Sequence, residues 1–224
     1  MSLPALSPDE RLAESARYAL LRRLMPAIRH NLAGSLQPIG MISAMLERRL
    51  QGASPDLGKL GQNASDISEL SREAASACMN LMTWLAPREN DTVALNSGLV
   101  EALQLQATEL SFRGFTLVNE TSAVDMPVHQ GTLRSLTMAS LIALTDAAAG
   151  PARIVLSAQP LEGETLLRIE LVATGGEAPP HGLQAYRPLG WDDVQALADA
   201  EQLVFSHSEN RVELRLPAAE VPGG

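Results

Sequence analysis

The sequence has few residues of the kinds that build disulfides, thiolate metal sites and aromatic pockets. Its 224 residues include one cysteine, Cys78, and only 3% aromatic residues. One cysteine cannot form an intrachain disulfide or a thiolate cluster, and it favours a reducing compartment over a secreted location. Lys59 is the only lysine, and the formal net charge is -9. Nucleic acid is therefore disfavoured as a partner, because non-specific binding depends on cations that neutralise phosphates.

Long apolar runs are also missing. The apolar stretches are short and interrupted, and the first ten residues contain no basic segment followed by an apolar one. We therefore expect neither a signal peptide nor a membrane span, and we expect a cytoplasmic location. Because 46% of the residues are hydrophobic, the chain has enough apolar material for one large domain or two small ones.

Two long amphipathic helices are predicted for the first 90 residues. Ser7, Pro8 and the two acids that follow are typical of a helix start. Apolar residues then recur every three or four positions to about Arg49, with Pro26 and Pro38 inside the pattern. A break at residues 51–56 separates this pattern from a second one, which runs to Pro87. The apolar members are Leu21, Leu24, Ile28, Leu32, Leu36, Ile39, Ile42, Leu46 and Leu50, then Leu57, Leu60, Ala64, Ile67, Ala74, Cys78, Leu81 and Leu85. The pattern predicts an antiparallel helical hairpin that two chains complete as a dimeric four-helix bundle.

The composition changes after a polar linker near residues 88–92. Helical patterns at about 97–112, 130–147 and 191–201 alternate with short β-rich runs at 115–118, 153–156, 167–171, 203–205 and 212–216. Alternating apolar and polar residues in the last three of these runs fit a sheet with helices on one face. The fold class is therefore α+β, with a helical hairpin in residues 1–90 and an α/β sandwich in residues 91–224. Residues 177–182 are predicted to form a loop.

The segment from Arg29 to Ile39 resembles the phosphoacceptor box of sensor histidine kinases. His30 is followed by leucine at the second and sixth positions and by isoleucine at the ninth, as in that box. The segment departs from the box at Asn31, where the family usually has Glu or Asp, and at Gly34, where Thr or Asn is common.

The second half of the chain resembles the ATP-binding domain of the same kinases in outline but not in its nucleotide motifs. Residues 126–136 look like that domain's strand-to-helix entry, and residues 188–198 with 212–217 look like its last helix and final hairpin. No asparagine occurs between residues 121 and 209. The positions that align with the magnesium- and phosphate-binding asparagines are Ala139 and Ala143. The adenine motif and the glycine-rich lid are similarly reduced.

A kinase-like hairpin joined to such a domain resembles the dimeric histidine phosphotransferases of bacterial phosphorelays. The resemblance implies a homodimer in which His30 accepts phosphoryl groups from receiver-domain aspartates and Asn31 lies beside the reacting group. It implies response-regulator receiver domains as partners, with a hybrid histidine kinase as a further candidate. It implies no resident cofactor, because the receiver brings the magnesium ion.

Helical geometry places His30 almost opposite the apolar stripe, facing solvent. Gly34, Gln37 and Met41 share this outer face, and with Arg29 they form the expected docking surface for a partner. Small residues allow close approach, and arginines attract an acidic or phosphorylated receiver.

Two alternatives stay open beside a phosphotransferase-like activity. The chain could be a non-catalytic module that docks receivers or kinases and regulates them by occupancy. An active histidine kinase is the other alternative, and the joint loss of several nucleotide ligands disfavours it.

Overall fold

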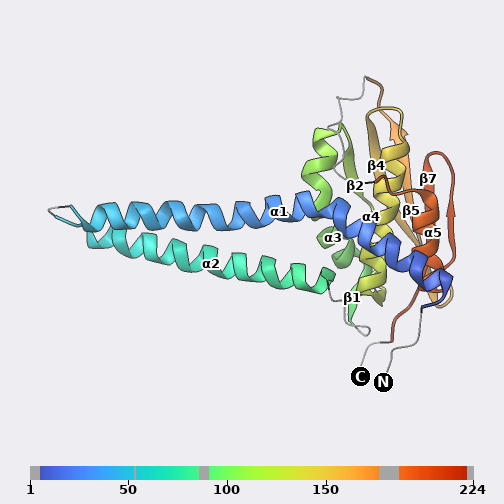
Figure 1. Cartoon of the computed structure of the whole chain (residues 1–224), viewed down its shortest axis with the longest axis horizontal. Helices are drawn as coiled ribbons and strands as arrows, with labels where there is room; N and C mark the ends of the chain where they lie inside the picture. The colour runs from blue at the N-terminus through green and yellow to red at the C-terminus, as the bar shows by residue number, and fades with distance from the viewer. Residues whose placement is uncertain (1–5, 53, 86–90, 177–186, 221–224) are drawn as a thin grey trace. The chain divides into compact units, whose positions relative to one another are not determined.

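The computed structural model describes residues 6–52, 54–85, 91–176 and 187–220 (Figure 1). The chain divides into two compact units, one of residues 25–87 and one of residues 1–24 with 88–224. We call them the hairpin unit and the C-terminal unit. The predicted division at residue 90 stays a prediction, and the structure groups residues 1–24 with the second half of the chain. The loop predicted at residues 177–182 lies outside the described residues.

Both long helices form where the sequence predicts them. Helix α1 spans Pro8–Leu50 with Pro26 and Pro38 inside it, and α2 spans Leu57–Leu85. The start of α1 is a capping box, because the Glu10 N–H donates to Ser7 Oγ at 3.2 Å and the Ser7 N–H donates to Glu10 Oε2 at 2.6 Å. The Lys59 N–H donates to Asp56 Oδ1 at 3.2 Å, which caps α2.

The contact between the two helices of the hairpin unit differs in part from the predicted seam. On α2 one stripe of buried or half-buried side chains consists of Leu60, Asn63, Ile67, Leu70, Ala74 and Ala77, and Asp66, Thr83 and Trp84 are half-buried as well. Leu57, Ala64 and Cys78 belong to the predicted seam but are exposed, as are Leu36 and Leu50 of α1. The physical reason is that α2 carries two adjacent stripes of uncharged residues, and only one of them faces α1.

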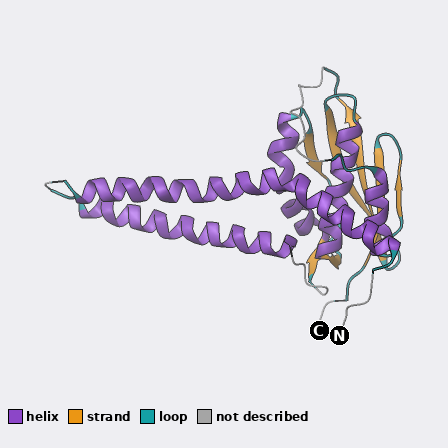
Figure 2. Ribbon diagram, viewed as in Figure 1, coloured by secondary structure: helices purple, strands orange, loops and turns teal. Residues whose placement is uncertain are grey.

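The C-terminal unit is an α/β sandwich, as predicted (Figure 2). Its five-stranded sheet has the order β2-β4-β5-β7-β6, in which β2 and β4 are parallel and the other neighbours antiparallel. The strands are β2 (Thr116–Asn119), β4 (Ala152–Pro160), β5 (Glu164–Ala173), β6 (Phe205–His207) and β7 (Arg211–Pro217). The helices are α3 (Leu95–Phe112), α4 (Gln130–Ala147) and α5 (Trp191–Ala200). Two short strands, β1 (Thr92–Ala94) and β3 (Pro127–His129), form a second sheet. Strand β1 is not predicted by any sequence pattern, because three residues are too few to show a period.

The period-two alternation of the strands separates core from solvent. Leu156, Ile169 and Leu214 are among the fully buried side chains of the central strands, and almost every residue of α4 between Leu133 and Thr145 is buried. Charged residues at the alternate strand positions form cross-strand ion pairs, such as Arg168–Glu213 at 2.9 Å. One face of the sheet therefore packs on helices and the other faces water.

Candidate functional site

His30 lies in the hairpin unit and its side chain is exposed. Ile28, Leu32 and Ile39, which are buried or half-buried, lie on the opposite side of the helix. Arg29 and Asn31, the neighbours of His30 in sequence, are exposed as well. The imidazole is therefore open to a partner from outside the hairpin.

The residues predicted to accompany His30 share its face of α1. Gly34, Gln37 and Met41 are exposed, and Met41 is 69% accessible. A Cβ added to Gly34 would meet no atom within 4 Å, so there is open space one turn beyond His30. Together they form a surface with a nucleophilic ring, a small gap and an adaptable apolar side chain.

The two prolines weaken the backbone on either side of His30. Pro38 has no N–H, so the Gly34 carbonyl lacks the donor that an ordinary helix supplies from four residues later. The Ser35 hydroxyl donates to the Asn31 carbonyl at 3.1 Å, within the same turn. The Gly34 carbonyl is therefore a hydrogen-bond acceptor on the His30 face that was not among the predicted site residues. It could have been predicted from the sequence, because a proline four residues after Gly34 removes the usual donor.

In the C-terminal unit, the two positions expected from the resemblance to align with nucleotide-binding asparagines are buried. Ala139 is 0% exposed and Ala143 is 4% exposed, both in α4. Leu189, in the segment expected to correspond to the lid, is buried at 2%, and Gly190 is the N-cap of α5. The Gly190 N–H donates to Asp193 Oδ2 at 3.0 Å, and Arg187 binds both oxygens of that carboxylate at 2.7 Å. These groups stabilise the start of α5.

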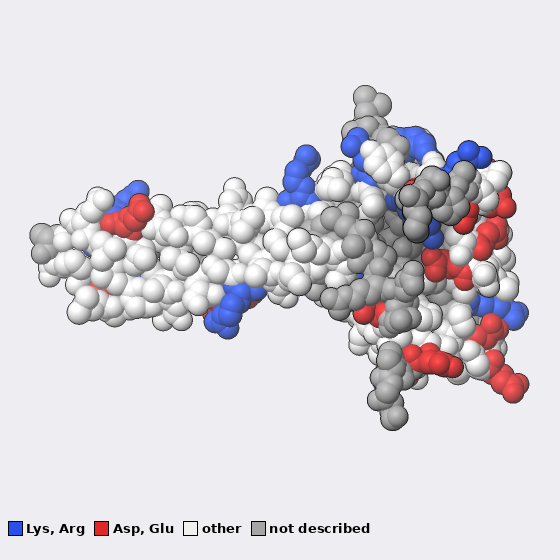
Figure 3. All heavy atoms as spheres, turned by 60° about the horizontal axis from the view of Figure 1, so that its bottom comes forward, with Lys and Arg blue, Asp and Glu red and all other residues white. Residues whose placement is uncertain are grey.

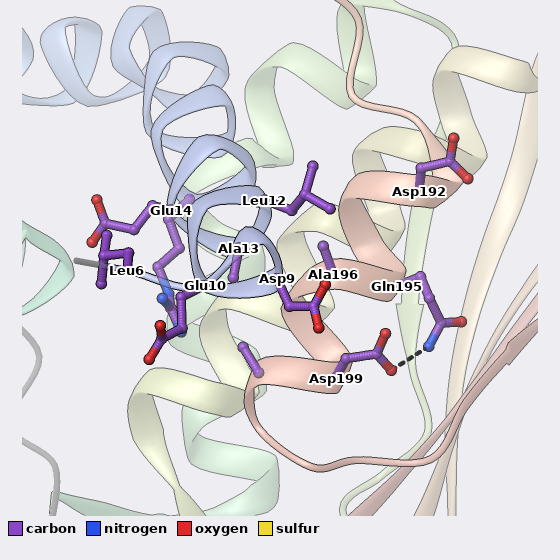
Figure 4. Close-up of a pocket in the computed structure, with 12 residues that line it drawn as sticks. Leu6, Asp9, Glu10, Leu12, Ala13, Glu14, Asp192, Gln195, Ala196 and Asp199 are labelled. Carbon is purple, nitrogen blue, oxygen red and sulfur yellow. Dashed lines mark hydrogen bonds between the residues drawn. The ribbon is translucent and has the colours of Figure 1, made fainter. Parts of the chain in front are cut away.

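A groove of about 860 Å³ lies within the C-terminal unit, between the first turns of α1 and α5 (Figure 4). Its lining carries several carboxylates, among them Asp9, Glu14 and Asp199, and one arginine, Arg17. Arg17 is paired with Glu201 at 3.2 Å. Carboxylates at this density repel the phosphates of a nucleotide, so the charge of this groove is unfavourable for nucleotide binding.

Among the described residues, no group of three or more His, Cys, Asp and Glu side chains is placed to hold a metal ion. In the same part of the chain, every helix is too short or too polar to cross a membrane.

The structure is similar to solved histidine kinases. The match to histidine kinase AdeS of Acinetobacter baumannii has 14% identity and a TM-score of 0.46, and covers 80% of this chain and 96% of that one. The match to a histidine kinase from Burkholderia phymatum has 14% identity and a TM-score of 0.47, and covers 96% and 100%. The match to a blue-light activated histidine kinase of Erythrobacter litoralis has 13% identity and a TM-score of 0.45, and covers 76% and 65%. No protein-family model and no curated protein matches the sequence. The similarity is one of fold.

Proposed function

We propose that this chain is a histidine phosphotransfer protein of bacterial two-component signalling, in which His30 relays phosphoryl groups between receiver-domain aspartates. The observation that carries the proposal is the exposure of His30 on the outer face of α1, beside the open space at Gly34. A partner's active site can approach this face without displacing a side chain one turn away. The exposed arginines Arg22 and Arg29 add a local attraction for an acidic or phosphorylated partner.

In this reaction the main task of the chain is to present the His30 imidazole to the receiver. A nitrogen of the neutral imidazole attacks the phosphorus of an aspartyl phosphate, the N–P bond forms, and the P–O bond to the departing carboxylate breaks. The other ring nitrogen keeps its proton. Asn31 can accept a hydrogen bond from it but cannot take the proton, so Asn31 orients the ring without acting as a base. The receiver contributes the aspartate and the magnesium ion, and the rate depends on alignment and charge neutralisation.

A homodimer formed through α2 is part of the proposal. Eight residues of α2 that recur at alternating steps of four and three are all exposed in the single chain, and none carries a charge. They are Leu57, Gly61, Ala64, Ser68, Ser71, Ala75, Cys78 and Met82. Much of the hairpin surface visible in Figure 3 is likewise free of charge. This spacing is that of a coiled-coil seam, and a second copy supplies an identical stripe to pack against it.

Charge placed on this stripe tests the dimer. Ala75→Glu puts a carboxylate into the proposed seam and should shift the full chain from dimer to monomer in light scattering at micromolar concentration. Ser76→Glu, one residue further along α2 and outside the stripe, is the matched control and should leave the dimer intact. A wild-type chain that is monomeric at these concentrations contradicts the dimer.

The relay itself is tested by phosphotransfer. The full chain is incubated with phosphorylated receiver domains and examined for an acid-labile, alkali-stable label. The label should vanish in His30→Ala and persist in His129→Ala, which removes another exposed histidine. Asn31→Asp should retain the label without creating labelling from ATP alone.

The same variants separate phosphotransfer from docking. If His30→Ala still binds the cognate receiver and supports signalling at the wild-type level, the chain acts by occupancy and the relay is refuted. A label on a residue other than His30 also refutes it.

A further inference from the structure

The first 17 residues of α1, Pro8–Leu24, belong to the C-terminal unit. Five side chains of this segment, Ala13, Ala16, Ala19, Leu20 and Leu24, are buried to 3% exposure or less. Apart from the adjacent pair Ala19 and Leu20, they recur at steps of three and four, so they lie on one face of the helix. Residues Pro8–Leu24 therefore act as an additional helix on a unit whose other elements come from the far end of the chain.

A buried cluster of charges fixes the end of this segment. Both Oδ atoms of Asp146, at the end of α4, accept hydrogen bonds from Arg23 at 3.1 Å, and Glu109 of α3 lies 3.9 Å from Arg23. Arg113 pairs with the same Asp146 at 2.8 Å and donates to the Thr145 carbonyl at 3.0 Å. The side chains of Arg23, Arg113 and Asp146 are only 9, 12 and 13% exposed. Loss of one partner would leave the others charged and poorly solvated, so the cluster holds only when it is complete.

The other end of the segment is held more weakly. Arg17 pairs with Glu201, just after α5, at 3.2 Å, and Glu201 accepts a hydrogen bond from Thr132 of α4 at 2.8 Å. Arg17 is 44% exposed, and exposed pairs contribute little. The Arg23 cluster is therefore the main polar attachment.

Helix α1 lacks a backbone hydrogen bond immediately after this attachment. The part of α1 that belongs to the C-terminal unit ends at Leu24, and the hairpin unit begins at Met25. Pro26 follows, and because it has no N–H, the helical hydrogen bond to the Arg22 carbonyl is missing. The boundary between the units and the missing hydrogen bond coincide.

We propose that Pro8–Leu24 is a latched helix of the C-terminal unit, that the Arg23–Asp146–Arg113 cluster is the latch, and that Pro26 is the hinge beyond it. With the latch closed, α1 is held to the C-terminal unit as far as Leu24. With the latch open, this attachment is lost, and the hinge residue Pro26 lies four residues before His30. The device does not depend on phosphotransfer at His30.

Amide hydrogen exchange of the full chain tests the latch and the hinge together. In Arg23→Met, the amides of residues 11–24 should exchange at least about tenfold faster than in the wild type, because the docked segment opens locally. The amides of residues 27–50 should exchange at the wild-type rate, because the change ends at Pro26. Asp146→Asn removes the negative charge of the same cluster on α4 and should give the same pattern. Arg11→Met, an exposed position in the same helix, is the matched control and should leave both segments unchanged.

Two results would contradict the proposal. Unchanged exchange in residues 11–24 in both cluster variants refutes the latch. Faster exchange that continues through residues 27–50 refutes the hinge at Pro26. Neither result depends on whether His30 accepts phosphate.

Discussion

An asparagine introduced at position 139 is expected to destabilise the C-terminal unit rather than create a nucleotide site. Ala139 is 0% exposed, and its neighbours Ile142 and Ala143 are 3 and 4% exposed. A larger side chain in such packing costs about 1–3 kcal/mol. A buried amide without a partner costs about 1–3 kcal/mol more. Ala139→Asn should therefore lower the free energy of unfolding by about 2–6 kcal/mol, a large part of the ~5–15 kcal/mol of an ordinary domain.

The measurement is urea unfolding of the full chain in a Trp84→Phe background, so that Trp191 reports the C-terminal unit alone. Ala107→Asn is the matched control, because Ala107 is exposed in α3 and the change costs only helix propensity, about 0.7 kcal/mol. Calorimetric titration of both proteins and of the wild type with Mg-ATP should show no binding up to millimolar nucleotide. If Ala139→Asn is as stable as the control and binds Mg-ATP, this face of α4 is open and the reasoning fails.

Two other predictions concern the stability of the C-terminal unit. Gly98→Ala should destabilise it by about 1–3 kcal/mol, because the new Cβ would lie 2.7 Å from atoms of Leu133 and Val93; an unchanged urea midpoint would contradict this. Hydrogen bonds from Arg187 hold the pKa of Asp193 below its ordinary value, so its stabilising contribution is complete above about pH 4 and is lost as the pH falls below that. Asp193→Asn should therefore be less stable than the wild type at pH 7, and the difference should shrink by pH 3; a constant difference would show that the ionised carboxylate contributes nothing.

Local signals in the sequence predict the elements well. Helix α4 is expected at 130–147 and spans Gln130–Ala147. The side chains of Ser7 and Asp56 each accept a capping hydrogen bond at the start of a helix. Pairing is harder to predict, because period-two alternation identifies a strand without its neighbour. The parallel pairing of β2 with β4 is an example.

Two features were missed for physical reasons. The packing of residues 8–24 depends on alanines, which carry little hydrophobic signal, and on contacts such as Arg23–Asp146, whose partners are 123 residues apart. On α2, periodicity detects apolar and small residues but cannot say which of two adjacent stripes meets α1. The exposure of the residues around His30 was easier to predict, since a polar residue opposite an apolar stripe faces solvent.

Charge is divided unequally between the two units, and this division is consistent with the relay proposed for the hairpin unit. Five basic and five acidic residues leave residues 25–87 with no net charge, whereas 12 basic and 21 acidic residues give the remainder the whole -9. A phosphorylated aspartate brings its own negative charge, so the acidic unit repels it at long range and the neutral unit does not. Within the hairpin unit, the exposed Arg29 lies next to His30 and adds a local positive charge there. In the C-terminal unit, Ala139 and Ala143 are buried and the groove beside α5 is lined by carboxylates, which repel phosphates. The relay that we propose therefore puts the phosphoryl group on the unit whose net charge opposes it least.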